Sequence, residues 1–399
     1  MKNPLTWLSK RRFPYTPLIT IEISRSRLIH NINQFIKLAP ESRLAPALKS
    51  NAYGHGIIEI AEIIEGEIRR DNKFRDSIPF FVIDSYFEAI ALRAKGIRTP
   101  LLIIGYTRPE TILNSNLKNV SYAVTDIESF KMLTNCIATR SSKLAISERR
   151  RVHLKIDTGM HRQGILPEEV DEAIKYLKLN NKIVLEGICS HLSDADGQDS
   201  TFTDEQIALW NQIVDQISSS IPSIKYIHLS NTYGHLYSKS IKANVSRLGI
   251  GMYGLADALR EKMDLQPILQ MKTIITSVKK LKMGDTVGYN NTFKSDRNMT
   301  IATIPVGYYE GLDRRLSNIG AVEVLPDNIS CPIIGRVSMN ITSIDVSLIK
   351  DIKIGSEVIV VSNNSNSKCS IEAISKLCNT ITYESSIMFP ENLKRVVVE

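Results

Sequence analysis

Eight short apolar runs most constrain what this chain can fold into. They lie near residues 44–48, 79–83, 100–104, 120–124, 152–156, 185–189, 225–229 and 245–250. Stretches with helical periodicity separate most of them. Eight strands that alternate with helices over roughly 210 residues are typical of a (β/α)8 barrel of the TIM type. A doubly wound open sheet is the alternative, but no Gly-x-Gly-x-x-Gly turn follows an early strand.

Two of the helical stretches carry a starting signal. Ser24 or Ser26 is expected to cap the first helix, and Thr203 with Gln206 matches a capping box at the start of a later one. The predicted buried face of the first helix is Leu28, Ile32, Phe35 and Ile36, and that of the later one is Ile207, Trp210, Val214 and Ile217.

The pattern changes beyond about residue 256. Runs typical of β-strands then lie between turn signals, and one short helix is expected at 370–377. These runs are 271–278, 300–305, 321–325, 331–334 and 357–361. We therefore predict an N-terminal extension over 1–17, a barrel over 18–255 and a mostly β domain over 256–399.

Composition narrows the class of protein. The chain has 399 residues, of which 43% are hydrophobic and 23% charged, and this is ordinary for a soluble globular protein. The net charge is +8, but the densest basic stretches, 149–151 and 279–282, are short and lack interleaved aromatic residues. We therefore expect no nucleic-acid partner.

The cysteines and the apolar stretches point to a reducing compartment. The five cysteines form no Cys-x-x-Cys pair, so neither a disulfide framework nor a metal site is expected. The first apolar residues are interrupted at 9–12, which predicts no signal peptide, and no apolar run is long enough to span a membrane. A cytoplasmic protein is expected.

Polar residues gather where the predicted strands end. The carboxyl ends of barrel strands carry the function, and the loops after strands seven and eight often hold phosphate. The residues that fall there are Lys49 after the first strand, Lys155 and Arg162 after the fifth, His191 after the sixth, Asn231 and Thr232 after the seventh, and Arg247, Gly249 and Ile250 after the eighth.

Lys49 suggests the chemistry. A lysine that is desolvated at a strand end becomes a usable amine, and Tyr53 follows four residues later. A reactive lysine and a phosphate site on one rim favour pyridoxal phosphate. Each residue also has a simpler interpretation: Lys49 could extend into solvent, His191 and His228 could be structural, and Gly249 could serve close packing.

The stretch Lys49-Ser-Asn-Ala-Tyr-Gly-His-Gly56 resembles the cofactor-lysine motif of pyridoxal-phosphate-dependent alanine racemases, and the resemblance continues through both predicted domains from about residue 18. It implies that Lys49 holds the cofactor covalently and that Arg162, supported by Lys155, contacts the substrate. It also implies that Arg247 faces the pyridine nitrogen. The remaining cofactor contacts implied by the family are Tyr53, His191, Asn231, Thr232, Gly249, Ile250 and Tyr383.

Three segments of the second domain extend the resemblance. They are 284–289 with Tyr289, 304–308 with Tyr308, and 335–339 with Met339. In the family these segments reach the cofactor of the partner subunit. The resemblance therefore implies a homodimer with shared active sites, in which Tyr289 is the second base and Tyr308 and Met339 contact the substrate.

Racemisation by itself requires such a pair of bases. The α-proton leaves from one face and a proton returns on the other, so two groups must flank the cofactor plane. Lys49 and Tyr289 can fill these roles. Arg247 does not release its proton at neutral pH, so it can only donate a hydrogen bond to the ring nitrogen, and this limits side reactions such as transamination.

The chain departs from the family pattern at three single positions and in its tail, where 389–395 lacks the common Pro-Arg-Val pattern. Ser338 and Asn340 flank Met339 where cysteine and aspartate are common, and Glu310 replaces an aspartate. We expect a racemase of alanine that supplies D-alanine for peptidoglycan. The alternatives are a serine or broad-specificity racemase, a decarboxylase with the same cofactor, and a non-catalytic carrier of the cofactor.

Overall fold

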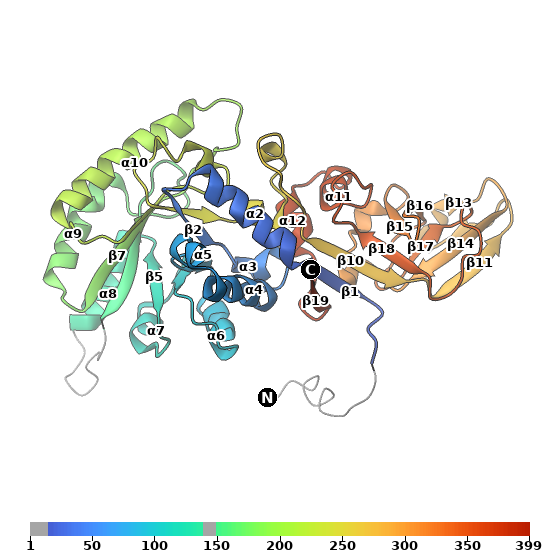
Figure 1. Cartoon of the computed structure of the whole chain (residues 1–399), viewed down its shortest axis with the longest axis horizontal. Coiled ribbons are helices and arrows are strands. Elements are labelled where there is room, and N and C mark those ends of the chain that lie inside the picture. Colours follow the sequence, from blue (N-terminus) through green and yellow to red (C-terminus); the bar gives the residue numbers. More distant parts are fainter. Residues whose placement is uncertain (1–14, 139–148) are drawn as a thin grey trace. The chain divides into compact units, whose positions relative to one another are not determined.

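The computed structural model describes residues 15–138 and 149–399 and divides into two compact units. The barrel unit is Ser24–Ile268 with Val397–Glu399. The sheet unit is Leu269–Val396 together with the described residues up to Ile23. Figure 1 shows the elements of both units.

Parallel strands form the barrel unit, and each of the eight predicted runs overlaps one. They are β2 (Arg43–Pro46), β3 (Phe81–Ile83), β4 (Leu101–Ile103), β5 (Val120–Val124), β6 (Arg150–Lys155), β7 (Ile183–Cys189), β8 (Tyr226–His228) and β9 (Val245–Leu248). Strands β3 to β8 pair in sequence order, and β2 pairs with β9. Backbone hydrogen bonds from Leu48 to Val82 and from Arg247 to Ser230 join the two sets, which closes the predicted barrel.

Helices flank these strands (Figure 1). They are α2 (Arg25–Leu38), α3 (Lys49–Tyr53), α4 (Ile57–Arg70), α5 (Asn72–Ser77), α6 (Tyr86–Ala94), α7 (Pro109–Asn114), α8 (Ile127–Ala138), α9 (Val170–Leu179) and α10 (Thr201–Ser220). Ser24 caps α2 as predicted, because its hydroxyl accepts a hydrogen bond from the backbone N–H of Arg27. The apolar faces predicted for α2 and α10 are buried.

The predicted capping box at Thr203 is wrong. Helix α10 already begins at Thr201, and the Thr203 hydroxyl donates to the carbonyl of Asp194 instead. The Gln206 amide oxygen accepts from the backbone and the hydroxyl of Ser193. Both side chains therefore hold the loop after β7, a tertiary role that the local pattern does not reveal.

The sheet unit is mostly β, as expected. Its nine-stranded sheet has the order β11-β14-β17-β16-β15-β18-β10-β1-β19. The strands are β1 (Thr20–Ser24), β10 (Leu269–Ile274), β11 (Ser277–Leu281), β14 (Met299–Ile304), β15 (Ala321–Val324), β16 (Ile329–Ile334), β17 (Thr342–Asp345), β18 (Glu357–Val361) and β19 (Lys394–Val398). A hairpin of β12 (Thr286–Val287) and β13 (Phe293–Lys294) and the helices α11 (Ile371–Leu377) and α12 (Thr382–Ile387) complete it.

The structure divides the chain at other positions than the sequence suggested. Residues 18–23 were expected to open the barrel, but β1 pairs antiparallel with β10, with Ile21 opposite Met271. The second division between the compact units lies between Ile268 and Leu269, whereas the sequence pattern placed the boundary after residue 255. The alternation of apolar residues predicts a strand at Ile19–Ile23, but the partner strand decides which sheet it joins.

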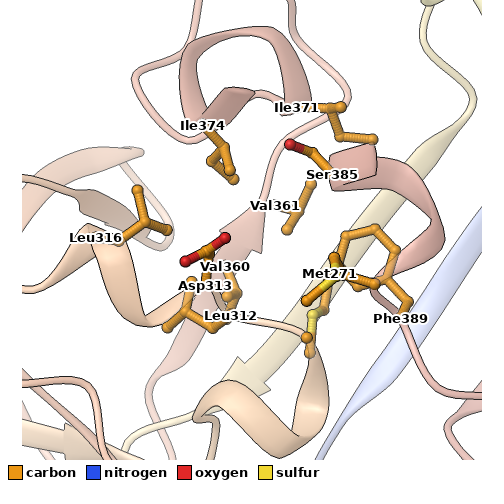
Figure 2. A pocket seen from close by; sticks show the side chains of 12 residues that line it. Met271, Leu312, Asp313, Leu316, Val360, Val361, Ile371, Ile374, Ser385 and Phe389 are labelled. Atoms are coloured by element: carbon orange, nitrogen blue, oxygen red, sulfur yellow. The ribbon is translucent and has the colours of Figure 1, made fainter. Parts of the chain in front are cut away.

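A small cavity in the sheet unit is lined mainly by apolar side chains (Figure 2). Residues of β10, β18 and α11 surround it, among them Met271, Val361 and Ile374. The carboxylate of Asp313 also lines it and is paired with Arg315 at 2.6 Å. The volume of about 10 Å³ holds about one water molecule. No residue predicted to be catalytic lines this cavity, which is therefore a gap in the core packing.

Candidate active site

Lys49 follows β2 after Ala47 and Leu48 and stands immediately before a left-handed turn. Residues Ser50–Tyr53 all have φ between 53° and 55°, a conformation that costs non-glycine residues about 1–2 kcal/mol each. Two side chains hold this turn. Glu88 Oε1 accepts from the backbone N–H of Ser50 at 2.7 Å, and Asn51 Oδ1 accepts from that of Ile57 at 2.9 Å. Such strained turns are concentrated at functional sites, where the surrounding structure must stabilise them.

The turn brings Tyr53 against the loop after β9. A Cβ atom added at Gly249 would lie only 2.6 Å from the Tyr53 hydroxyl oxygen, so the hydroxyl depends on glycine at this position. Burial raises the pKa of Tyr53 to about 12, although the charge of Arg247 opposes the shift. The hydroxyl therefore keeps its proton at neutral pH and acts as a hydrogen-bond donor.

Thr232 lies on the same loops. Its hydroxyl oxygen accepts from the backbone N–H groups of Gly249 at 3.1 Å and Gly251 at 3.3 Å. The backbone N–H of Gly249, in a loop expected to hold phosphate, thus bonds to Thr232. With both lone pairs of the oxygen engaged, the hydroxyl must donate its proton to a third group. Gly251 serves close packing, because a Cβ there would meet Phe35 at 2.5 Å.

Arg247 is the buried cation of the barrel unit's rim. Its Nη1 atom donates to the Nδ1 atom of His228 at 2.8 Å and to the backbone oxygen of the same residue at 2.9 Å. Its Nη2 atom donates to the backbone oxygen of Ser190 at 2.6 Å and lies 3.0 Å from Nδ1 of His191. Burial and the Arg247 charge hold the pKa of His191 well below its usual range, so this imidazole is neutral.

Lys155 ends β6 and is more buried than Lys49. Only 7% of Lys155 is exposed, and its Nζ atom donates to Oε1 of Gln163 at 3.1 Å. Burial lowers the pKa of Lys155, and the positive charges of Arg162 and Arg247 lower it further, although Cys189 opposes them. We expected a desolvated lysine at position 49, but Lys49 is half-buried. The desolvated lysine of this rim is Lys155.

The predicted segments of the sheet unit come together. The backbone N–H of Tyr308 donates to the carbonyl of Ser338 at 3.0 Å, which joins the segments 304–308 and 335–339. A Cβ at Gly335 would lie 2.7 Å from the carbonyl oxygen of Val287, so the segment 284–289 packs there as well. Tyr289 follows Val287 and Gly288 and is 68% exposed. Tyr383 is half-buried in α12.

Comparison with known proteins decides the family. Residues 23–257 match the model of the alanine racemase N-terminal domain, and residues 268–397 match that of the alanine racemase C-terminal domain. The chain belongs to the alanine racemase family. It is a pyridoxal-phosphate-dependent amino-acid racemase, because the family uses pyridoxal 5'-phosphate as its cofactor.

Several relatives of the alanine racemase family are similar over nearly their whole length. The chain is 32% identical to the alanine racemase of Clostridium tetani over 97% of each protein, and 30% identical to that of Methanococcus maripaludis over 95% of this chain and 98% of the relative. The structure of an alanine racemase from Clostridium difficile superposes with a TM-score of 0.85 at 27% identity, covering 96% and 97% of the chains. A histidine racemase from Leuconostoc mesenteroides has the same fold, with a TM-score of 0.83 at 24% identity over 97% and 99% of the chains.

The barrel residues fit the family's cofactor. The Tyr53 hydroxyl, the Thr232 hydroxyl and the small residue Gly249 form a donor-rich cradle suited to a phosphate group. The buried guanidinium of Arg247 offers a cationic donor that suits a ring nitrogen. Lys49 supplies an amine on the same segment as Tyr53.

Sequence reasoning missed three residues around Arg247 and Lys155. His153, two residues before Lys155 on β6, contacts His228, and Glu186 lies beyond His153. Gln163 was also overlooked, although it holds Lys155. A glutamate inside the apolar run of β7 was the available signal, because a charge in a buried strand needs a partner.

No helix in the described parts of the chain is long and apolar enough to cross a membrane.

Proposed function

We propose that the chain interconverts L- and D-alanine and supplies D-alanine for peptidoglycan. The observation that carries the proposal is the arrangement around Lys49. The left-handed turn that follows Lys49 places the Tyr53 hydroxyl against Gly249. The alanine racemases with which the chain shares about a third of its residues support alanine as the substrate.

In the proposed site, Lys49 holds the cofactor covalently, and the phosphate is bound by the Tyr53 cradle. The full set of proposed cofactor contacts is Lys49, Tyr53, His191, Asn231, Thr232, Arg247, Gly249, Ile250 and Tyr383. The cofactor, when bound, withdraws electrons from the α-carbon and so acidifies its C–H bond. Arg247 donates a hydrogen bond to the ring nitrogen and keeps its own proton.

The protein's residues then move the proton. Lys49, freed when the substrate amine displaces it from the cofactor, removes or returns the proton on one face of the α-carbon, and Tyr289 acts on the other face. Arg162 binds the substrate carboxylate, because a guanidinium makes two parallel hydrogen bonds to a carboxylate group. Lys155 supports Arg162 from β6. Tyr308 and Met339 border the substrate.

The first experiment tests Lys49. The protein reconstituted with cofactor should show a visible absorbance band that borohydride abolishes, and the same sample should form D-alanine from L-alanine. Lys49→Ala should lose both, whereas the control Lys178→Ala, an exposed lysine on α9, should keep both. A band that persists in Lys49→Ala would contradict the assignment.

We also propose a homodimer in which each chain completes the site of its partner. The side chains of Tyr289, Tyr308 and Met339 are 68%, 41% and 54% exposed, which is unusual for residues that must contact a substrate. A second copy of the chain that covers them would explain this. Exposed aromatic and methionine side chains are typical of such interfaces.

Mixing two inactive variants tests the shared site. Lys49→Ala and Tyr289→Phe homodimers should each be nearly inactive. A mixed dimer would unite an intact Lys49 from one chain with an intact Tyr289 from the other at one of its two sites. Activity should therefore reappear after the variants are unfolded and refolded together. If each site used residues of one chain only, the mixture would stay inactive.

Steady-state rates on several amino acids test the substrate. We expect kcat/KM to be highest for alanine, with serine as the strongest rival because Ser338 and Asn340 change the surroundings of Met339. Histidine belongs in the test because a histidine racemase has the same fold. Negligible turnover of alanine would overturn the proposal. Release of carbon dioxide from a basic amino acid would indicate the decarboxylase, and a bound cofactor without turnover would indicate the carrier.

We place the protein in the cytoplasm. All five cysteines lie among the described residues as free thiols, which suits a reducing compartment.

A further inference from the structure

A buried row of polar side chains begins at the Nη1 atom of Arg247, whereas the contact with His191 is made by its Nη2 atom. The Nη1 atom of Arg247 lies 2.8 Å from Nδ1 of His228, and the Nε2 atom of His228 lies 2.8 Å from Nδ1 of His153. The Nε2 atom of His153 lies 3.6 Å from Oε2 of Glu186. His153 and His228 are at most 1% exposed. We call these four residues the relay.

The two ends of the relay determine where its protons lie. Arg247 has only N–H donors, so Nδ1 of His228 must accept and its proton must be on Nε2. That N–H then donates to Nδ1 of His153, whose own proton is therefore also on Nε2. Oε2 of Glu186 lies 3.6 Å from this second Nε2 atom, too far for a hydrogen bond but close enough for the negative charge to attract its proton. Burial lowers the pKa of both histidines, so both imidazoles are neutral and each has one donor and one acceptor.

The backbone of β7 makes room for the relay. Val152 pairs with Leu185 and His153 pairs with Gly187, so Glu186 is the extra residue of a β-bulge. A Cβ at Gly187 would lie 2.6 Å from Nδ1 of His153, so only glycine leaves space for this imidazole.

Aromatic rings enclose the histidines. Tyr226 stacks on His153 at 5.9 Å, and Phe80 meets the same imidazole edge-on at 5.7 Å. In these apolar surroundings each hydrogen bond of the relay is stronger than it would be in water.

Neighbouring groups keep Glu186 ionised. The hydroxyl of Ser121 donates to Oε2 of Glu186, and the guanidinium of Arg151 lies 3.8 Å from Oε1. The carboxylate is therefore a fixed negative charge at one end of the relay, and the Arg247 guanidinium is a fixed positive charge at the other.

We propose that Glu186 and His153 are positioning residues of the racemase, which act through His228 to fix the orientation and proton arrangement of Arg247. The inference rests on the proposed contact between Arg247 and the ring nitrogen of the cofactor. The carboxylate determines the tautomer of His153, the imidazole of His153 determines that of His228, and Arg247 is left with its remaining N–H groups directed away from the relay. As long as the relay is intact, the hydrogen bond that Arg247 donates to the ring nitrogen of the cofactor therefore keeps the same geometry and strength.

Nitrogen NMR of the cofactor-free protein tests the relay without reference to catalysis. With selectively labelled histidine, both His153 and His228 should show a neutral ring protonated on Nε2. Histidine signals are assigned with the variants His153→Gln and His228→Gln. Protonation of either ring on Nδ1 in the wild-type protein would overturn the proposal, since that tautomer cannot accept from Arg247 or from His228.

Glu186→Gln removes the charge but keeps the size of the side chain. Glu172→Gln is the matched control. Glu172 lies on α9, outside the relay, and forms an ion pair with Lys131 on α8. In Glu186→Gln we expect a second histidine tautomer and a shift in the NMR signal of the labelled ring nitrogen of bound cofactor. Cofactor affinity should fall on the order of tenfold, which is typical when a residue that orients a ligand-binding side chain is changed. Glu172→Gln should leave all three unchanged.

The outcomes separate the relay from the proposed function. If Arg247→Lys shifts the ring-nitrogen signal and Glu186→Gln does not, Arg247 contacts the cofactor but the relay proposal is overturned. If Arg247→Lys leaves the signal unchanged, the proposed cofactor contact fails, and the proposal that rests on it fails too, even if the histidine tautomers are as expected. Equal effects of Glu186→Gln and Glu172→Gln on all readouts would also overturn it.

Discussion

The Nδ2 atom of Asn340 donates a hydrogen bond of 2.6 Å to Oε1 of Glu310. Both positions stand out in the sequence as departures from the family motif, and the structure shows that the two side chains are in direct contact. The other oxygen of Glu310 accepts from the backbone N–H of Gly307 at 2.9 Å. The pair therefore fixes the segment of Tyr308 to the segment of Met339 on the sheet unit.

Asn340→Asp should destabilise the protein more than Asn340→Ala does. The aspartate would place a second carboxylate against Glu310 and remove the donor, which should lower the free energy of unfolding by about 1–3 kcal/mol. Urea unfolding at neutral pH measures this. The control is Asn366→Asp, at an exposed asparagine. Equal stability of Asn340→Asp and Asn366→Asp would contradict the pairing.

Gly249→Ala should weaken cofactor binding. The new Cβ would meet the Tyr53 hydroxyl at 2.6 Å, and such overpacking costs about 1–3 kcal/mol, equivalent to roughly tenfold to hundredfold in affinity. Equilibrium titration with the cofactor measures the change. Gly66→Ala is the control, because no atom lies within 4 Å of the added Cβ. In the interior of α4 it should stabilise the protein by about 0.5–1 kcal/mol without altering affinity.

Tyr289→Phe should lower kcat for alanine racemisation by a factor of about 10²–10⁴, the contribution typical of one acid–base group. Exchange of the α-proton with deuterated solvent should persist for the enantiomer that presents its proton to Lys49, because that base remains. Tyr309→Phe, at a neighbouring exposed tyrosine, should leave kcat within a factor of about two. Unchanged racemisation in Tyr289→Phe would exclude Tyr289 as the second base.

Glu186 should make the free energy of unfolding decrease as the pH falls into the acidic range. Burial opposes ionisation of this carboxyl, but its contacts with His153 and Ser121 lower its pKa from 4.5 to about 2. A depressed pKa contributes stability above pH 4.5 that is lost as the pH falls toward 2. The carboxyl is partly exposed, so we expect a contribution of about 1–2 kcal/mol.

Urea unfolding between pH 6 and pH 3 measures this contribution. Wild type should be more stable than Glu186→Gln at pH 6, and the difference should shrink as the pH falls. A difference that stays constant with pH would show that Glu186 contributes by packing and not by its charge. The variant Glu172→Gln controls for the loss of a carboxylate elsewhere on the barrel unit.

Local periodicity was sufficient for the elements of the barrel. Each predicted apolar run overlaps a strand, because a parallel strand covered on both faces must be apolar along most of its length. The same pattern did not predict β17, β19 or α12, which are short and depend on their neighbours. Ser24 could be recognised as a cap because its hydrogen bond to Arg27 spans only three residues.

The candidate site was harder to predict from the sequence than the strands were. The stretch that begins at Lys49 pointed to the cofactor, but nothing in it predicts that Lys49 is half-buried and Lys155 the desolvated lysine. The difference arises from burial and from the charges of Arg162, in the loop after β6, and of Arg247, which comes from β9.

The sequence by itself determined the order of the strands, the residues at their carboxyl ends and the family's cofactor. Only the tertiary structure decided which of those residues meet. Asn340 with Glu310, Tyr53 with Gly249, and His153 with Glu186 are contacts between residues at least 30 positions apart. Local patterns report which face of an element is buried, but a contact between distant residues depends on how the whole chain packs, and no local pattern encodes that.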